Sequence, residues 1–538
     1  MSSRTVLVVA VAVVVAVGLT RPGPDRSRPL APQVPAAASS ALVARLARER
    51  AQPFPDNGRF AYGGCNLLMI SVHNVGNEHM SLYGYARPTT PRLDKWAEDA
   101  LVFEDFYTPV SWSLPAATSL FTSLQPYAHK VMDRYRTNLL SPQVRTLPEL
   151  LKLYSYKTAA FTGGLDYAKA FGHMRGFEEM PENPDFSDFS LTLTQAREWL
   201  ARNGSSKFFL YLQGYTAHPP FTPPAPFKGV FSELRGRHVT VDNRLTVRAY
   251  RSSPGVYEGY YLKKDIARLK GDQSRPGLNS PGSRKVLLTQ DDISYLQDLY
   301  DEEVLQVDSM LGDFLDSLDA KLLSNTVVVL YSEHGEMFGR HGRFGRAGTV
   351  RGCLYDDVVH VPLLVRLPGH RGGTVRGLTQ IVDVMPTLLE LLEIPVPHGI
   401  QGLSLLPLVR TGLPVNPYVF AGAEYNGGRK KPNGLFAPES VAESIRNPEW
   451  KLIHEQLFSD PEAHRRGQVD EETYELYDLR KDLQEQDDVS ALNPAVVEEL
   501  KGRLKRWAEA SSRFTLAAPG TLEVPAAVVD KARQHGYW

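Results

Sequence analysis

The stretch Asn-Leu-Leu-Met-Ile-Ser-Val, residues 66–72, carries the strongest signal for the fold. A continuous apolar run of this length predicts a β-strand that is covered on both faces. Similar runs recur at 157–161, 208–212 and 326–331. Helical periodicity lies between the runs, at 146–153 and 293–318. This alternation predicts an α/β fold with a doubly wound, mostly parallel sheet, whose functional groups gather at the carboxyl ends of the strands.

The region before this strand differs in character. Arg4 precedes an apolar run at 6–19, which predicts a signal peptide or signal anchor over residues 1–20. Residues 21–62 are rich in Pro, Ala and Arg and predict a flexible linker. No cysteine directly follows the apolar run, so a lipid anchor on such a cysteine is excluded. We therefore expect an exported protein (periplasmic, secreted or membrane-anchored) with its folded domain outside the cytoplasm.

The remaining chain divides into two parts. Residues 63–413 carry the strand and helix alternation and predict one large α/β domain, with a polar insertion at about 226–284. Residues 414–538 hold short strand-like segments, a helical pattern at 494–510 and a tail. They predict a smaller C-terminal antiparallel subdomain.

Composition excludes several classes of protein. The 538 residues include 60 Lys and Arg against 61 Asp and Glu, so bulk charge does not favour nucleic acid. A hydrophobic share of 42% excludes global disorder. The two cysteines, Cys65 and Cys353, cannot form a disulfide framework or a thiolate zinc site, and spacing alone does not decide whether they pair.

Polar residues stand at or near the predicted strand ends in three segments. These are Ser-Val-His-Asn at 71–74, Ser-Trp-Ser-Leu-Pro at 111–115 and Ser-Glu-His-Gly-Glu at 332–336. None of them is specific alone. Further motifs follow in a fixed order: HMSLYGY at 79–85, TTPRLD at 89–94, FEDFY at 103–107, HPPFTPP at 218–224, LYDD at 354–357, EWKLI at 449–453 and YELYDL at 474–479.

In this order the motifs resemble the sulfatase family of the alkaline-phosphatase superfamily. The resemblance implies that family's α/β fold and hydrolysis of a sulfate or phosphate ester. It also implies a divalent cation, usually Ca²⁺, held by two Asp after the first strand and by an Asp followed by Asn or His after a later strand. The nucleophile is normally a formylglycine made from Cys or Ser within a motif that contains Arg.

The sequence departs from that pattern in both metal-binding pairs. The first pair is His73 and Asn74, and the later pair is Glu333 and His334. His73 is interpreted either as a buried, hydrogen-bonded histidine or as a nitrogen ligand. Two imidazoles and one carboxylate suit Zn²⁺ or Mn²⁺/Fe²⁺ better than the Ca²⁺ of the resemblance.

The nucleophile position holds Ser113, and Ala117 replaces the Arg of the modification motif. The missing Arg argues against formylglycine, so unmodified serine is the expected nucleophile. Ser113 precedes an apolar helical pattern and is also interpreted as an N-cap. The two roles are compatible, because a helix N-terminus favours an anionic group.

Three further residues complete the candidate site. His218 is a candidate general acid for the leaving alcohol, or a surface histidine. His341 and Arg340 are candidates for binding the anionic substrate, or solvated loop residues.

These residues support a leading hypothesis, a sulfatase-like hydrolase that acts on a sulfate or phosphate ester through a divalent metal and an unmodified serine. The alternative is a catalytically inactive protein of the same fold that binds a sulfated or phosphorylated glycan or a protein partner. A further alternative is a phospho-alcohol transferase of the cell envelope.

Overall fold

The computed structural model describes residues 60–132, 139–232, 239, 247–250, 257–261, 285–346, 353–425, 440–458 and 468–514. The predicted signal segment and most of the predicted linker lie outside this range. Export therefore stays a prediction. Within the described residues, no helix is long and apolar enough to cross a membrane.

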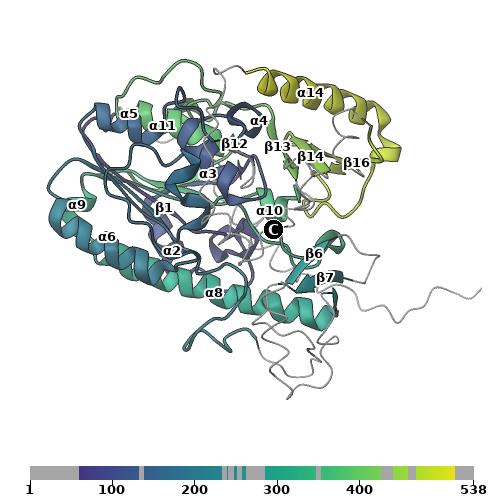
Figure 1. The fold of residues 1–538 in the computed structure, drawn as a ribbon, viewed down its shortest axis with the longest axis horizontal. Helices are drawn as coiled ribbons and strands as arrows, with labels where there is room; N and C mark the ends of the chain where they lie inside the picture. The colour runs from purple at the N-terminus through teal and green to yellow at the C-terminus, as the bar shows by residue number, and fades with distance from the viewer. Residues whose placement is uncertain are drawn as a thin grey trace, which may run out of the picture.

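A seven-stranded sheet of described residues forms the centre of the α/β domain, in the order β11-β2-β10-β9-β1-β5-β4 (Figure 1). Its strands are β1 (Asn66–Ser71), β2 (Leu101–Phe103), β4 (Lys157–Phe161), β5 (Phe208–Gln213), β9 (Thr326–Tyr331), β10 (Leu363–Arg366) and β11 (Gly373–Val375). Strand β1 pairs parallel with both β5 and β9, and β10 is antiparallel to both of its neighbours. The predicted mostly parallel sheet is confirmed, with β10 as its antiparallel member.

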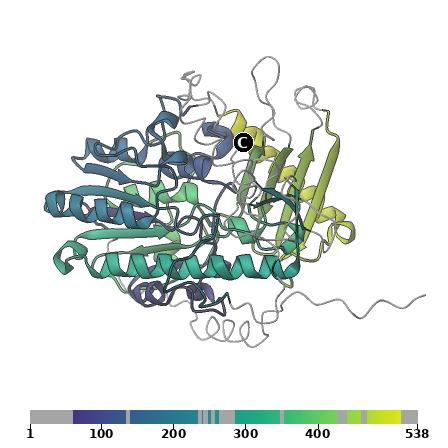
Figure 2. The same ribbon diagram turned by 60° about the horizontal axis from the view of Figure 1, so that its bottom comes forward.

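Helices cover both faces of this sheet (Figures 1 and 2). They include α2 (Pro91–Trp96), α3 (Ser113–Thr122), α5 (Leu147–Leu153), α6 (Phe189–Asn203), α8 (Gln290–Asp316) and α11 (Val384–Leu391). Strand β1 shows why two layers are needed. Leu67 and Met69 join the core beneath α3, α5 and α11, whereas Leu68 and Ile70 join the core beneath α6 and α8. Apolar residues on both faces bury the strand completely, as its sequence predicts.

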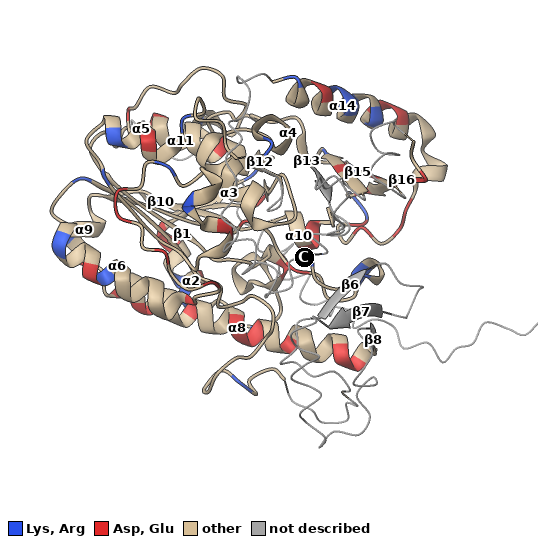
Figure 3. Ribbon diagram, viewed as in Figure 1, with Lys and Arg blue, Asp and Glu red and all other residues tan. Residues whose placement is uncertain are grey.

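Helix α8 carries acidic residues and no basic ones, which Figure 3 shows as red bands along its length. Several of these carboxylates are buried and hold neighbouring loops. Asp301 accepts hydrogen bonds from the ring of His79 at 2.7 Å and the hydroxyl of Tyr85 at 2.6 Å. Asp308 accepts the backbone N–H of Leu93 at the start of α2. The HMSLYGY and TTPRLD motifs are therefore fixed against α8 by buried, hydrogen-bonded carboxylates.

The C-terminal subdomain is a four-stranded antiparallel sheet with a helix packed on it. Its elements are β13 (Val419–Tyr425), β14 (Ser440–Arg446), β15 (Trp450–Leu457), β16 (Glu471–Asp478) and α14 (Pro494–Ser512). Leu500 and Leu504 of α14 pack on Ile445, Leu452 and Leu476 of the sheet. The predicted antiparallel subdomain is confirmed. The predicted insertion is described only in part, by β6 (Val247–Tyr250) and β7 (Tyr257–Tyr261), which pair in a three-stranded sheet with β8 (Lys285–Leu288).

Candidate active site

The carboxyl ends of β1 and β9 lie side by side, because the two strands are parallel neighbours with Ser71 opposite Tyr331. His73 and Asn74 follow β1, and the pair at 333–334 follows β9. All four of these side chains are buried with no exposed surface. The structure therefore brings the two predicted pairs together at one edge of the sheet.

Ser113 enters this site from α3. Its Oγ lies 3.2 Å from Nε2 of His334. Nδ1 of His334 lies 3.0 Å from the carbonyl oxygen of Gly335, which can only accept, so Nδ1 carries the ring proton. Nε2 then presents a lone pair, and the Ser113 hydroxyl donates its hydrogen bond to it. A serine hydroxyl that donates to a histidine nitrogen is the arrangement of an activated nucleophile.

The interpretation of Ser113 as an N-cap is wrong in its detail. Trp112 is the N-cap of α3, and Ser113 is the first helical residue, with no side-chain capping bond at this end. The Ser113 side chain is consequently available for its contact with His334. Its position at the first turn of the helix still places it where the helix dipole favours negative charge.

Glu333 contacts His73, and its two carboxylate oxygens also accept hydrogen bonds from other side chains. Its Oε2 accepts the Ser71 hydroxyl at 2.5 Å and lies 3.3 Å from Nδ1 of His73. Its Oε1 accepts the hydroxyl of Tyr167, and the hydroxyl of Tyr331 lies 3.4 Å away. A carboxylate only accepts, so Nδ1 of His73 carries the ring proton and Nε2 presents a lone pair. Glu333 therefore orients an imidazole here, and its role as a metal ligand stays a prediction.

A second carboxylate links the other members of the site. Asn74 donates from Nδ2 to Glu336 at 2.6 Å, and Arg346 donates to the same Glu336 oxygen at 2.8 Å. Burial raises the pKa of Glu336, while Arg346 and Asn74 act in the opposite direction. Arg346 also donates from Nη2 to Nε2 of His218 at 2.7 Å. This buried chain of contacts fixes the orientation of the Asn74 amide.

His218 belongs to the site but is held as a neutral acceptor. Its Nδ1 donates to the carbonyl of Pro219 at 2.8 Å, so its Nε2 lone pair receives the Arg346 contact. Burial, and then the positive charge of Arg346, lower the pKa of His218 well below its ordinary value. Its ring stacks on that of His73 with centroids 5.8 Å apart. The predicted proton donor is therefore arranged as a residue that packs against His73, with its ring proton directed to Pro219.

The two predicted substrate-binding residues are held by other groups. Arg340 forms a two-pronged ion pair with Glu78, at 2.8 and 2.5 Å, and a further contact with Asp357 at 3.2 Å. His341 stacks on the ring of Tyr355 with centroids 3.7 Å apart. These contacts give both residues structural roles in the loop. Among the described contacts, neither Arg340 nor His341 contacts Ser113 or His73.

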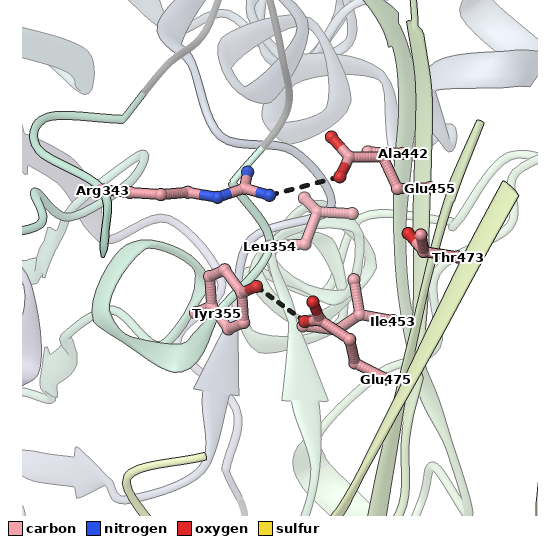
Figure 4. A pocket seen from close by; sticks show the side chains of 8 residues that line it. All are labelled: Arg343, Leu354, Tyr355, Ala442, Ile453, Glu455, Thr473 and Glu475. Carbon is pink, nitrogen blue, oxygen red and sulfur yellow. Dashed lines mark hydrogen bonds and ion pairs between the residues drawn. The ribbon is translucent and has the colours of Figure 1, made fainter. Parts of the chain in front are cut away.

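A separate small cavity lies against the C-terminal sheet (Figure 4). Arg343 pairs there with Glu455, and Tyr355 donates to Glu475 at 2.6 Å. Its volume is about 10 Å³, which is room for no more than one water molecule. This cavity is too small to receive an ester substrate.

Among the described residues, two groups at the site have no hydrogen-bond partner. They are Nε2 of His73 and Oδ1 of Asn74, on adjacent buried residues. Ca²⁺ takes about six to eight oxygen ligands. The four positions offer Asn74 Oδ1 as a free oxygen, while the carboxylate of Glu333 is already engaged. The donors therefore do not fit the Ca²⁺ that the resemblance implies, although two imidazole nitrogens and an amide oxygen suit a borderline transition metal. No cluster of three or more His, Cys, Asp or Glu side chains arranged as a metal site occurs among the described residues.

Three residues of the site escaped the sequence analysis in whole or in part. Glu336 lies within the segment at 332–336 but received no role. Arg346 is not among the predicted site residues, yet its side chain is just 11% exposed and contacts Glu336. Tyr167 reaches Glu333 across 166 residues of sequence, and no local pattern marks it.

The two cysteines are both free thiols. Cys65 contacts the Asn325 side chain at 3.3 Å, whereas Cys353 is buried beside Arg343. Neither thiol contacts Ser113 in the described chain.

Comparison with known proteins gives consistent relatives. The chain is 23% identical over 493 residues to N-acetylglucosamine-6-O-sulfatase of Bacteroides thetaiotaomicron, covering 79% of this chain and 82% of the relative. It is 24% identical over 475 residues to human Arylsulfatase A, covering 81% and 86%. The crystal structure of a phosphonate monoester hydrolase of Agrobacterium radiobacter superimposes with a TM-score of 0.61 at 21% identity, covering 83% of this chain and 96% of that one.

Family models match both parts of the molecule. Residues 339–510 match the C-terminal model of N-sulphoglucosamine sulphohydrolase. Residues 66–394, more than half of the chain, match the sulfatase model, and they contain β1, β9, α3 and the whole cluster around Ser113. The chain belongs to the sulfatase family.

Proposed function

We propose that this protein hydrolyses a sulfate or phosphate ester, with unmodified Ser113 as the nucleophile. The observation that carries the proposal is the direction of one hydrogen bond. The Ser113 hydroxyl donates to a lone pair on His334 Nε2 at 3.2 Å, and Gly335 holds His334 in the tautomer that makes this lone pair available. The pair is buried, so bulk water does not compete for the proton.

The chemistry follows from this pair in two steps. Oγ of Ser113 attacks sulfur or phosphorus, its proton passes to His334 Nε2, and the bond from that atom to the ester oxygen breaks. The leaving alkoxide takes a proton from solvent, because His218 directs its ring proton to Pro219. Water then attacks the sulfur or phosphorus of the serine ester and the bond from that atom to Ser113 Oγ breaks. The proton held on His334 Nε2 returns to Oγ, and inorganic sulfate or phosphate is released.

The substrate class is supported by the relatives. The relatives are named N-acetylglucosamine-6-O-sulfatase, Arylsulfatase A and phosphonate monoester hydrolase. We infer that a sulfated or phosphorylated glycan is the natural substrate. The N-terminus of α3 favours an anionic group beside Ser113.

A divalent metal would be held by His73 Nε2 and Asn74 Oδ1, the two acceptors at the site that have no hydrogen-bond partner among the described residues. When bound, a divalent metal supplies Lewis-acid polarisation of the ester and lowers the pKa of a coordinated hydroxyl. The residues around it supply orientation. Glu333 fixes the His73 ring, and Glu336 fixes the Asn74 amide.

The experiment compares two serines of the same helix. Purified protein, Ser113→Ala and Ser119→Ala are assayed on aryl sulfate, aryl phosphate and phosphonate monoester substrates, with folding checked by circular dichroism. We expect Ser113→Ala to lose about 10³-fold or more in kcat/KM on the preferred ester, and Ser119→Ala to retain most of it. Equal turnover by wild type and Ser113→Ala would overturn the proposal. Retained binding of a sulfated glycan without any turnover would favour the inactive binding protein instead.

A further inference from the structure

We propose that Glu455 of the C-terminal sheet is a positioning residue for the reaction and acts through its buried ion pair with Arg343. This pair holds the segment at 336–346, whose two ends carry Glu336 and Arg346 into the active site. The inference rests on the proposed function for its effect on turnover. The placement of the segment itself can be measured without turnover.

The segment at 336–346 folds back on itself as a hairpin. An antiparallel bridge joins Phe338 to Phe344 within it. The side chains of Glu336 and Arg346 meet at the two ends of the hairpin, with Nη1 of the arginine 2.8 Å from Oε2 of the glutamate. The position of the hairpin therefore decides where these two charged side chains lie.

Both ends of the hairpin contact residues that lie next to the reacting groups. Glu336 accepts the amide of Asn74 at 2.6 Å, and Arg346 donates to His218 at 2.7 Å. The ring of His218 in turn stacks on that of His73. A shift of the hairpin would displace these side chains together, and a displacement of about 1 Å in an active site can cost about 10²-fold in rate.

Arg343 connects the hairpin to the C-terminal sheet. Its side chain is buried, and its Nη2 lies 3.2 Å from Oε2 of Glu455 on β15, which Figure 4 shows across the small cavity. Its Nη1 contacts Sγ of Cys353 at 3.6 Å, and its guanidinium carbon lies 5.5 Å from the centroid of the Tyr355 ring. Removing the carboxylate of a buried ion pair leaves the other charge uncompensated, so the guanidinium would have to move.

The hairpin is held on two sides. Arg340 pairs with Glu78 on the side of the α/β domain. On the side of the C-terminal sheet, Met337 packs in one buried apolar cluster with Ile453 of β15. Apolar packing is non-directional, whereas an ion pair with arginine adds geometric specificity. The pair made by Arg343 therefore sets the orientation of the hairpin against this sheet.

The first test is hydrogen–deuterium exchange of the full-length protein, measured peptide by peptide with mass spectrometry. We expect Glu455→Gln to exchange faster in peptides that cover 336–346, while peptides that cover β1 and β9 keep their wild-type rates. Glu475→Gln is the matched control, because Glu475 lines the same cavity from β16 but contacts Tyr355 in place of Arg343. This control should leave exchange in the hairpin unchanged.

The second test is steady-state kinetics on the preferred aryl ester. Glu455→Gln should lower kcat about 10–100-fold with little change in KM, because the hairpin orients groups for the reaction. Glu475→Gln should keep the wild-type kcat. The double variant Arg343→Gln, Glu455→Gln should be no more impaired than the weaker single variant, since both residues act through one contact. If Glu455→Gln does not fold, Glu455→Asp keeps the charge, shortens the side chain and should show the same changes at smaller size.

Three results would overturn the proposal. They are unchanged exchange of the hairpin in folded Glu455→Gln, an equal rise of exchange throughout the chain, and additive effects of the substitutions at 343 and 455. Wild-type protein without turnover would overturn the proposed function instead. The exchange measurement would then still decide whether Glu455 holds the hairpin.

Discussion

Helix α3 carries two buried serines that each contact a histidine at nearly the same distance, yet the two contacts run in opposite directions. Ser113 lies 3.2 Å from Nε2 of His334, and Ser119 lies 3.1 Å from Nε2 of His129. Nδ1 of His129 accepts the backbone N–H of Val131 at 3.0 Å, so the proton of His129 is on Nε2. His129 therefore donates to Ser119, whereas Ser113 donates to His334.

The direction of the proton, more than the residue types or the distance, separates a reactive pair from a structural one. Burial lowers the pKa of His129 to about 3, so this ring stays neutral and its contacts stabilise the fold. His334 has its lone pair facing a hydroxyl at the ends of β1 and β9. Residue types and distance alone therefore do not distinguish the two pairs.

The largest effect is expected from a substitution that breaks the reactive pair of Ser113 and His334 and leaves the structural pair of Ser119 and His129 intact. His334→Gln removes the nitrogen that faces Ser113 and should lower kcat about 10²–10⁴-fold, the usual contribution of general-base catalysis. Steady-state kinetics on the preferred aryl ester measure this loss. His129→Gln is the matched control, and a comparable fall in its kcat while it remains folded would contradict the distinction between the pairs.

A smaller effect is expected from substituting Glu333, which contacts His73 beside the reactive pair. Glu333→Gln keeps the size of the side chain but removes the charge that holds Nδ1 of His73. We expect the affinity for Co²⁺ to fall about 10–100-fold, as for other outer-shell partners of metal ligands. Competition titration with a coloured chelator measures it. Unchanged affinity would show that His73 does not need Glu333.

The structural pair should affect stability more than turnover. Ser119→Ala leaves a buried ring nitrogen of His129 with one partner fewer, which should lower the free energy of unfolding by about 1–3 kcal/mol. Urea denaturation measures this change, and kcat should remain within about twofold of wild type. A large loss of kcat with little loss of stability would place Ser119 in the reactive group.

The smallest effect concerns pH and the histidine next to the structural pair. Burial lowers the pKa of His173 from 6.5 to about 3, and its ring lies among Phe121, Tyr167 and Phe171. The unfolded chain takes up this proton near pH 6.5 and the folded chain does not. Stability is therefore lost as the pH falls from about 6.5 towards 3, by about 1.4 kcal/mol per pH unit for this residue.

His173→Phe should remove that contribution and flatten the fall in stability with acid. Chemical denaturation at pH 7, 6 and 5 measures the slope for the variant and the wild type. An unchanged slope would contradict a neutral, buried His173.

The sequence predicted the scaffold well, because continuous apolar strands and periodic helices leave direct patterns. It also predicted His73, Asn74, Glu333 and His334 as residues of one site, and the parallel pairing of β1 and β9 explains why the two pairs lie at one sheet edge. The role of Glu333 could not be predicted, because nothing in its spacing says that its carboxylate turns to Tyr167 and Ser71.

Arg346 escaped for a related reason. A charged residue in a Gly-rich loop usually faces solvent, and only the folded chain shows that this guanidinium meets Glu336 and His218. The tautomers of the histidines are likewise set by tertiary contacts. The sequence names the groups of the site, but the contacts decide which of them are acceptors.

The most direct test of the account looks for the serine ester itself. Protein mixed with an excess of the preferred aryl ester is quenched in acid within the first turnovers, and its intact mass and peptides are measured. We expect one added sulfuryl or phosphoryl group on Ser113, absent from Ser113→Ala and present in Ser119→Ala. Turnover without any adduct on Ser113, together with full activity of Ser113→Ala, would contradict it.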